Sequence, residues 1–486
     1  MYRLRQLDVD DKVCEQVDLA LVEKIYPKEV IIECIEGSPS WTSKRRRVRQ
    51  TTPYTLVWLL IGMALWSRLN QWQVWQKLVG KLSIIHPGKK QGKLSDSGIS
   101  GRRKDLGSEG LEALRQKCCV VIADPRTMPS AFFGRYRLLA IDGTVFNTPD
   151  TRANDEAFGR SSNQYGKGAY PQVRCVLLVE CGTHAVIGLH MSRYDVSEVH
   201  GAHHLLAQIG PNMLLTVDAG ITSGGLFERA RAQRAHVLGA LETGTWEKLA
   251  KQRRLSDGSV LAWVPPSKKG AACYPVQQGI WVRIISYRLT DERLGEEGKV
   301  YRLVTTLLNP KTAPALTLVE LYHERWEIEL VIDEIKTHER MQRKVLRSKT
   351  PQGIKQELQG VFLAHYLVRA LMAQAALTGE HDPDRLSFTE GLFQVTEMID
   401  LALLFEPEAE ATASLLVQLQ EKLVEKLLPP RTLRINRREV KQVYNKYKPK
   451  KRNLPPPDPF KPDDRFLDFV ALLDPLAPPV LTQKGA

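Results

Sequence analysis

Four side chains between positions 322 and 336 are of types that could bind and cleave a phosphodiester. They are an aromatic hydroxyl, a guanidinium, a carboxylate and an ammonium, supplied by Tyr322, Arg325, Glu329 and Lys336. Cationic groups bind phosphate oxygens, and a carboxylate binds a metal ion that can activate the phosphodiester. The set therefore suits a phosphodiester held next to a metal ion.

The surrounding sequence predicts one helix that carries all four. Pro314 cannot continue a helix behind it, and Thr317, three residues before Glu320, matches a capping box. The apolar residues follow the i, i+3, i+4, i+7 spacing of a core-facing stripe, at Ile328, Val331, Ile332 and Ile335. At 3.6 residues per turn the four polar residues fall within roughly 60° of one another, on one face.

The same face has a less specific interpretation. A solvated face with several ion pairs would show the same residue types. Asp333 also lies on it, so helix geometry alone does not single out Glu329 as the metal ligand.

Two further carboxylates follow predicted strands upstream. Asp142 comes directly after the apolar run 137–141, and Asp218 comes directly after 213–217. An Asp-Gly pair after a strand is also ordinary turn chemistry, so neither aspartate is informative alone.

The elements around these aspartates predict an α/β fold. Strands are expected at 172–180, 185–191 and 236–241, with helices at 196–209 and 226–235. The order strand, strand, strand, helix, strand, helix, strand is that of a ribonuclease-H-like sheet, in which carboxylates at or near neighbouring strand ends can meet one from a later helix.

The distance from Asp218 to Glu329 predicts an insertion. The 111 residues that separate them are too many for the last helix of a bare fold, so residues 244–315 are expected to form a β-rich insertion with strands at 259–264, 280–289 and 299–307.

Composition indicates a negatively charged partner. The 486 residues carry a net charge of +14 and a pI near 9.3, which favours nucleic acid first, an anionic membrane second, and otherwise a protein that is merely basic. Seven cysteines without a CxxC pair indicate neither a disulfide framework nor a zinc site and fit a reducing cytoplasm. The N-terminus lacks an apolar leader core, and the apolar runs 54–66 and 361–377 are too short or too charged to span a bilayer, so no membrane is expected.

The two ends of the chain are expected to be helical. In the N-terminal part, the run 44–49 is basic, and four tryptophans are assigned to a helical core rather than to base stacking: Trp58, Trp66, Trp72 and Trp75. A linker is expected at 88–105, followed by a helix near 112–118.

Near the C-terminus, 429–452 holds ten Lys and Arg against one acid and predicts a tail or linker that would bind DNA non-specifically. The expected domains are 1–125 (helical, N-terminal), 130–243 (core, first part), 244–315 (insertion), 316–377 (core, with the glutamate helix) and 378–486 (helical C-terminal region with the basic, Pro-rich tail).

Two other patterns predict no site. His203 and His204, beside His200, are adjacent on a predicted helix and point apart, and no HExxH or cysteine accompanies them, so they are assigned structural or surface roles. The run 165–168, Tyr-Gly-Lys-Gly, lacks the spacing of a phosphate-binding loop.

The spacing of Tyr322, Arg325, Glu329 and Lys336 resembles the signature of DDE transposases of the bacterial insertion-sequence-four family. The resemblance covers roughly 135–374 and includes the runs 170–174, 179–184 and 346–350. The chain departs from the family at Ile221, where an aromatic residue is usual, and at Tyr301, where a relative uses a tryptophan to stack on a flipped base.

The resemblance implies a cut-and-paste DNA transposase. Asp142, Asp218 and Glu329 would bind two Mg²⁺ ions, with Mn²⁺ as a substitute, for hydrolytic release of the transposon's 3′ ends and strand transfer into target DNA. By the same resemblance, Tyr322 and Arg325 would contact phosphates near the cleaved end, and Lys336 would contact the adjacent strand. Tyr301 would stack on a base, with ordinary packing within the protein as the alternative.

The resemblance also implies partners and a compartment. The N-terminal region would bind double-stranded DNA with terminal inverted repeats, a homodimer would pair two ends, and the protein would act in the bacterial cytoplasm at the nucleoid. Two alternatives remain open at this stage: a catalytically silent DNA-binding protein derived from a transposase, and a ribonuclease-H-like nuclease without strand transfer.

Overall fold

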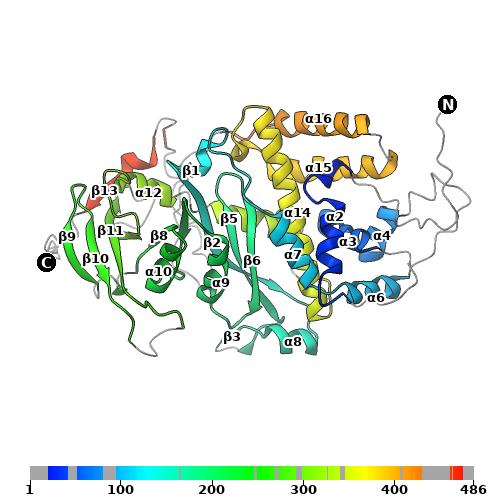
Figure 1. Ribbon diagram of the computed structural model, residues 1–486, viewed down its shortest axis with the longest axis horizontal. Coiled ribbons are helices and arrows are strands. Elements are labelled where there is room, and N and C mark those ends of the chain that lie inside the picture. The colour runs from blue at the N-terminus through cyan, green and yellow to red at the C-terminus, as the bar shows by residue number, and fades with distance from the viewer. Residues whose placement is uncertain are drawn as a thin grey trace, which may run out of the picture. The chain divides into compact units, whose positions relative to one another are not determined.

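The computed structural model shows two compact units (Figure 1). It describes residues 20–41, 52–79, 95–163, 166–242, 244–245, 249–268, 273–291, 298–323, 325, 327–339, 345–405, 409–429, 460–461 and 464–473. The first unit comprises 1–205 and 327–428, and the second comprises 206–326 and 429–486. Both units therefore join segments that are distant in sequence.

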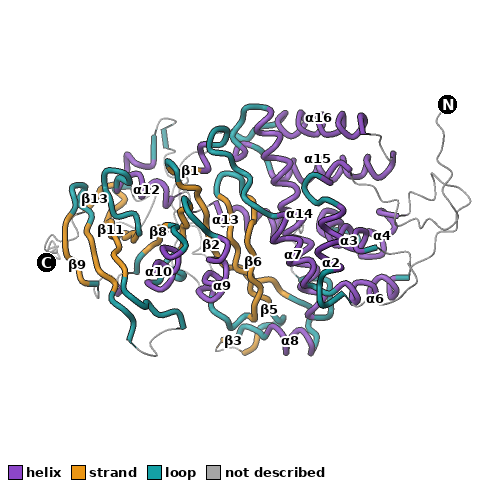
Figure 2. The backbone as a smooth tube through the Cα atoms, in the orientation of Figure 1, coloured by secondary structure: helices purple, strands orange, loops and turns teal. Residues whose placement is uncertain are grey.

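The first unit combines a helical region with three long strands (Figure 2). Its N-terminal helices are α1 (Ala20–Glu23), α2 (Lys28–Glu36), α3 (Pro53–Leu65), α4 (Gln71–Val79), α6 (Asp96–Leu106) and α7 (Glu109–Cys118). The strands and helices that follow are β1 (Phe132–Phe133), β2 (Tyr136–Asn147), α8 (Arg152–Phe158), β3 (Ser162–Asn163), β4 (Gly166–Lys167), β5 (Gln172–Glu180), β6 (Ala185–Arg193) and α9 (Glu198–Leu205). The chain later returns to this unit with α13 (Glu327–Asp333), a π-helix (Glu334–Glu339), α14 (Pro351–Thr378), α15 (Phe388–Phe405) and α16 (Ala409–Glu425).

Strands β2, β5 and β6 form an antiparallel meander whose register fixes which side chains share a face. Gly143 pairs with Val176, which pairs with His190. Asp142 is in the next pair along the two strands, where it lies opposite Leu177. Because cross-strand partners point to the same face and successive residues alternate, Asp142 and His190 lie on opposite faces of these strands.

Helix α14 is the central helix of the first unit. Thr350 caps it by accepting a hydrogen bond from Gly353 N at 3.2 Å. It packs against α3, all of whose residues are buried, and Gly360 makes the contact close: a Cβ at that position would lie 2.5 Å from the backbone oxygen of Leu60. Among the described residues, α14 alone is long and apolar enough to cross a bilayer. Because 83% of its most apolar window is buried within the protein, it is a core helix here.

The second unit is built on a mixed sheet. Strands β7 (Met213–Val217) and β8 (His236–Ala240) are parallel and are joined by α10 (Gly224–Ala232). The sheet continues antiparallel in the order β8, β12, β11, β10, β9, and β13 pairs with β11. The bounds are β9 (Ala250–Arg254), β10 (Val260–Val264), β11 (Ile280–Leu289), β12 (Tyr301–Thr305), α12 (Ala315–His323) and β13 (Val470–Leu473).

The predicted α/β class is confirmed, with a helical N-terminal region and the expected order of strands and helices from β2 to β8. The predicted strands of the insertion correspond to β10, β11 and β12, whereas β9 was not predicted. Trp58, Trp66 and Trp75 are buried, as the core interpretation requires, and Trp72 is 44% exposed.

Two sequence predictions about local structure are wrong. Part of the linker expected at 88–105 is helix α6, which Ser95 caps by accepting a hydrogen bond from Gly98 N at 3.1 Å. Strand β2 does not end before Asp142 but continues to Asn147, because its pairing with β5 extends through Gln172. The basic runs 44–49 and 430–452 lie outside the described residues.

Candidate active site

Asp142 lies within strand β2, partly exposed. The backbone N–H of Gly143 donates a hydrogen bond to Asp142 Oδ1 at 2.7 Å, which fixes the carboxylate relative to the strand. A strand paired along its length is a rigid support, so the position of this carboxylate is set by the sheet rather than by a loop.

Within the first unit, the elements that carry Glu329 and Lys336 lie next to β2. Helix α13, which carries Glu329, packs against β2. Phe146 shares the face of Asp142, four residues further along the strand, and Lys336 Nζ lies 5.3 Å from its ring centroid. The fold of this unit therefore brings the elements of Asp142, Glu329 and Lys336 together.

In the second unit, Asp218 follows β7 directly, as predicted. Its Oδ1 accepts a hydrogen bond from Ile221 N at 2.9 Å, and its backbone oxygen accepts one from Thr222 N at 3.0 Å. These bonds close a tight turn before α10 and hold the carboxylate at the end of the strand.

Tyr322 and Arg325 also belong to the second unit, where α12 packs against β8. The Arg325 guanidinium lies 5.7 Å from the ring centroid of Tyr322. Burial raises the pKa of Tyr322, the charge of Asp218 raises it further, and Arg325 opposes both. The Tyr322 hydroxyl is therefore close enough to Asp218 to sense its charge, and the phenol stays protonated at neutral pH as a hydrogen-bond donor.

Tyr301, on β12, packs against a second tyrosine. Its ring stacks on Tyr287 with centroids 5.4 Å apart and planes inclined by 25°, and Lys299 Nζ lies 5.3 Å from its ring. This contact agrees with the packed alternative. A role in base stacking remains a prediction.

The prediction of one continuous helix through all four signature residues is wrong. Helix α12 ends at His323, α13 begins at Glu327, and a π-helix occupies Glu334–Glu339. Residues 324 and 326, between α12 and α13, lie outside the described residues. The π-helix, with its i→i+5 bonds, shifts Lys336 from the 3.6-residue spacing that would relate it to Glu329, and no Gly or Pro marks the π-helix in the sequence.

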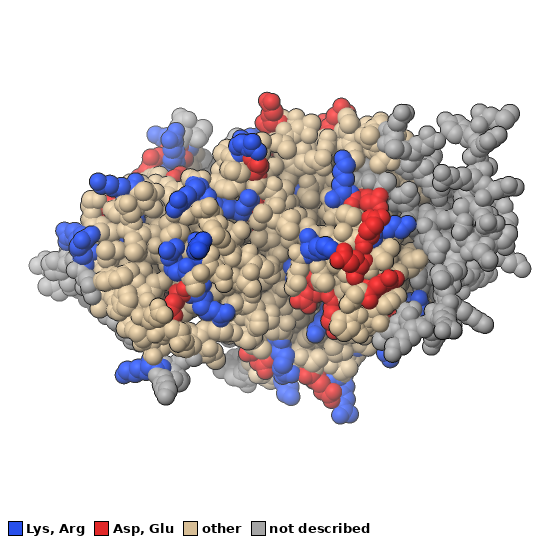
Figure 3. All heavy atoms as spheres, in the orientation of Figure 1, with Lys and Arg blue, Asp and Glu red and all other residues tan. Residues whose placement is uncertain are grey.

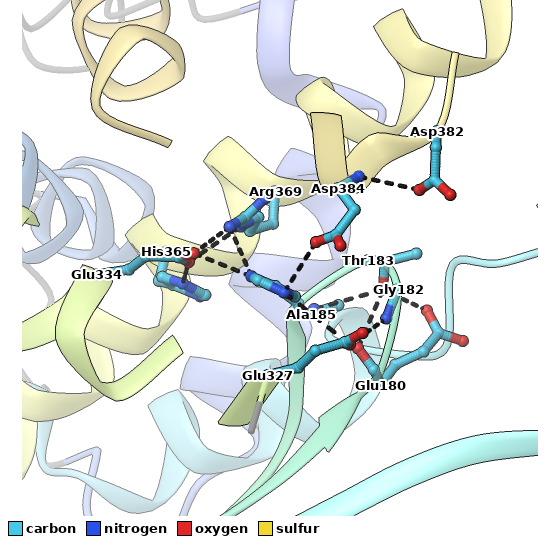
Figure 4. Close-up of polar contacts among 11 residues, drawn as sticks. Glu180, Gly182, Thr183, Ala185, Glu327, Glu334, His365, Arg369, Asp382 and Asp384 are labelled. Carbon is cyan, nitrogen blue, oxygen red and sulfur yellow. Dashed lines mark hydrogen bonds and ion pairs between the residues drawn. The ribbon is translucent and has the colours of Figure 1, made fainter. Parts of the chain in front are cut away.

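The π-helix places Glu334 in a buried polar cluster of the first unit (Figure 4). Arg369 Nε and His365 Nε2 each lie 3.0 Å from Glu334 Oε2, and His184 Nδ1 lies 2.9 Å from Glu334 Oε1. Arg369 and His365 come from α14, and His184 comes from the turn between β5 and β6. The cluster therefore fastens the segment after Glu329 to both α14 and the sheet.

The charges in this cluster are strongly coupled. Burial raises the pKa of Glu334, but Arg369 and His184 outweigh it, and the pKa lies well below its usual value. Burial and Arg369 lower the pKa of His184, yet Glu334 and Asp384 outweigh them and raise it to about 9. The pKa of His365 is lowered, chiefly by burial. At neutral pH the cluster thus holds a carboxylate between a guanidinium and an imidazolium, with His365 neutral.

Two further carboxylates, Glu180 and Glu327, bind the turn between β5 and β6. Glu180 accepts hydrogen bonds from Ile122 N at 2.9 Å and from the Thr183 hydroxyl at 2.7 Å, and it forms an ion pair with Arg137. Glu327, at the start of α13, accepts the backbone N–H of Gly182 at 2.7 Å. Figure 4 shows Glu327 and Glu180 converging on this turn. The β5–β6 turn therefore connects the sheet, through hydrogen bonds, to the helix that carries Glu329.

Sequence reasoning missed this cluster, although one signal was present. His365 and Arg369 are four residues apart on one face of an otherwise apolar helix, which indicates a buried polar partner. The partner itself could not be identified, because Glu334 is five residues beyond Glu329 among several acidic residues.

Each of the three predicted carboxylates has the chemistry of a ligand for a hard cation. Asp142, Asp218 and Glu329 are each partly exposed, and each offers oxygen donors of the kind that Mg²⁺ prefers. Asp142 and Asp218 are oriented by backbone N–H groups, which is how ligand carboxylates are commonly held.

Comparison with known proteins agrees with this class of site. Residues 133–367 match the family described as transposase DDE domain, and residues 16–116 match the insertion element 4 transposase N-terminal family. A DNA transposase that depends on divalent metal is thus the class that the fold and the carboxylates define.

The relatives identify the family within that class. The chain is 32% identical over 376 residues to the transposase InsG for insertion sequence element IS4 of Escherichia coli (strain K12), covering 76% of this chain and 80% of that protein. It is 26% identical over 194 residues to the putative transposase InsZ of the same organism, covering 40% of this chain and 60% of that one. The chain belongs to the IS4 family of DDE transposases. A solved structure of piggyBac transposase, a synaptic complex with hairpin DNA, aligns with a TM-score of 0.41 at 11% identity over 87% of this chain and 88% of that one.

Proposed function

We propose that Asp142, Asp218 and Glu329 are the metal ligands of this transposase and that the ions are two Mg²⁺. The observation that supports the proposal is the packing of α13, which carries Glu329, against β2, which carries Asp142. When bound, such ions supply Lewis-acid stabilisation of the attacking and leaving oxygens of a phosphodiester.

The protein side chains contribute orientation and charge. The hydroxyl of Tyr322 donates to a phosphate oxygen, and Arg325 binds the same phosphate through its guanidinium. Lys336, in the π-helix, neutralises the strand next to the cleaved end. These roles place the 3′ end for cleavage and for its later attack on target DNA.

Single substitutions of the three carboxylates test the proposal. Asp142→Ala, Asp218→Ala and Glu329→Ala each abolish Mg²⁺-dependent cleavage of an inverted-repeat duplex, while a gel-shift assay still shows end binding. Asp333→Ala, on an exposed side chain of the same helix as Glu329, is the matched control and keeps its activity. Undiminished nicking by the Asp218→Ala protein would overturn the assignment.

A second assay separates transposition from simple cleavage. A pre-cut end with a free 3′-hydroxyl is incubated with a supercoiled plasmid, and joined products are counted by gel. The transposase links the end to the plasmid. A nuclease without strand transfer would cut the inverted-repeat duplex but give no joined product, and a silent DNA-binding protein would give neither.

We also propose that the N-terminal helices bind the inverted repeats and that two copies pair two ends in the cytoplasm, at the nucleoid. Figure 3 shows acidic side chains gathered near α2 and α7, and these helices carry Glu29, Glu33, Glu36, Glu109 and Glu112. Phosphates are repelled by such a patch, so the DNA-contacting surface of this region lies away from it.

A further inference from the structure

Three histidines outside the proposed active site form a cluster on the first unit. Their ligand nitrogens all lie within 4.8 Å of one another, and they belong to His190, His200 and His204. His190 comes from β6, whereas His200 and His204 are four residues apart on α9 and therefore share a face. In the sequence, His203 and His204 beside His200 indicate no metal site, because His190 comes next to His200 and His204 only when α9 packs on the strands.

The geometry is close to that of a metal site. His200 Nε2 and His204 Nε2 are 3.0 Å apart, and nitrogens that bind one tetrahedral zinc through bonds of about 2.0–2.1 Å are separated by roughly 3.3 Å. The His190 ring stacks on His204 with centroids 4.4 Å apart and planes inclined by 7°. Because stacked parallel rings do not aim their nitrogens at one point, metal binding requires the exposed His204 ring to rotate out of this stack.

The contact between the two α9 histidines also suits a metal. The short Nε2 to Nε2 contact of His200 and His204 requires that one of the two rings offer a lone pair, and a cation could replace the proton between them. A metal binds the neutral form of imidazole through such a lone pair.

We propose that His190, His200 and His204 bind a transition-metal ion of the Zn²⁺ class, with water in the fourth position. Three imidazoles select zinc, nickel or copper over Mg²⁺, which prefers oxygen ligands. This site is separate from the proposed catalytic ligands, because His190 lies on the face of the sheet opposite to Asp142.

The bound ion would link α9 to strand β6 and so hold the helix against the sheet. Gly201 of α9 lies against Val176, the strand partner of both Gly143 and His190. At the other end of the same row, the Glu198 carboxylate lies where a Cβ of Gly143 would be, and Glu198 forms an ion pair with Arg174. A metal at the histidines therefore fixes the helix that supports β2 directly behind Asp142.

Zinc titration of the full-length protein tests the proposal. The protein is stripped with a chelator and titrated calorimetrically with Zn²⁺ in excess Mg²⁺, which fills oxygen sites without competing for imidazole. One ion is expected to bind with micromolar or tighter affinity and to raise the melting temperature by several degrees. Co²⁺ at the same site should give the intense visible absorption of tetrahedral coordination.

Three variants make the test decisive. His190→Gln and His204→Gln should each weaken Zn²⁺ binding at least tenfold and remove the rise in melting temperature. His381→Gln, at an exposed histidine outside the cluster, is the control and behaves as wild type. Because His204 is exposed, its substitution leaves the fold intact. Equal Zn²⁺ affinity in wild type and His190→Gln would show that the α9 pair alone binds the ion, and absence of 1:1 binding would overturn the proposal entirely.

Discussion

The Glu334 carboxylate, five residues beyond Glu329, lies 3.0 Å from Arg369 Nε in the buried interior of the first unit. The two residues come from the π-helix and from α14, so their ion pair joins the segment behind the proposed catalytic glutamate to the central helix. Support of this kind holds a catalytic carboxylate in place without contact to the substrate.

Removing one partner of this pair should be strongly destabilising. Arg369→Met leaves the buried Glu334 carboxylate with His184 as its remaining charged partner, for which a loss of up to about 3–5 kcal/mol in the free energy of unfolding is expected. The double variant Glu334→Gln with Arg369→Met should recover part of that loss, because neither charge remains. Urea denaturation followed by far-ultraviolet circular dichroism measures both. Arg126→Met, which breaks an exposed ion pair with Asp124, is the control and should change little. Equal losses in Arg369→Met and the double variant would contradict the account.

The stability of the protein should fall as the pH rises from about 6.5 to 9. The pKa of His184 is raised to about 9 in the folded protein, so its contribution is complete below 6.5 and is lost as the pH passes 9. A difference of this size corresponds to roughly 3 kcal/mol. In acid, stability falls for the opposite reason, because Glu334, whose pKa is depressed, becomes protonated only well below 4.5. The melting temperature, measured from acid pH to above pH 9, reports both losses. In His184→Gln the fall in melting temperature between pH 6.5 and 9 should be smaller. An unchanged slope in that variant would assign the loss to other groups.

Two glycine substitutions should have opposite effects on stability. Gly360→Ala places a Cβ 2.5 Å from the backbone oxygen of Leu60, so α3 and α14 must separate, at a cost of about 1–3 kcal/mol. Gly101→Ala, within α6, meets nothing within 4 Å and should stabilise by about 0.5–1 kcal/mol, because alanine restricts the unfolded chain and favours helix. Thermal denaturation of the two variants beside wild type tests this contrast. Destabilisation by both would indicate that helical glycine is required for another reason.

Arg325 should matter for DNA rather than for folding. Its guanidinium lies over the Tyr322 ring and is partly exposed, so Arg325→Ala removes a phosphate contact and should slow cleavage roughly 10–100-fold. The dependence of DNA binding on salt should become shallower by about one unit of slope, since one fewer counterion is released. Arg325→Lys should restore the salt slope but not the full rate, because an ammonium cannot make a bidentate contact. Arg152→Ala, at a highly exposed arginine of α8, is the control. A normal cleavage rate in Arg325→Ala would remove this residue from the proposed site.

The sequence by itself determined the elements around the carboxylates. Alternating and continuous apolar runs gave β7, β8 and β11 within a residue or so, because strand burial imposes a short-range pattern on the chain. The spacing of Tyr322, Arg325, Glu329 and Lys336 was sufficient to indicate the family, since it depends on residue identity alone.

Only the tertiary structure decided how these residues are held. The π-helix after Glu329 leaves no local signal, because it follows from where Glu334 finds buried partners on α14 and on the β5–β6 turn. The approach of His190 to His200 and His204 depends on the register of β5 with β6 and on how α9 crosses them. Local patterns report on neighbours in the chain, whereas these contacts join residues that meet only after the strands have paired and the helices have packed.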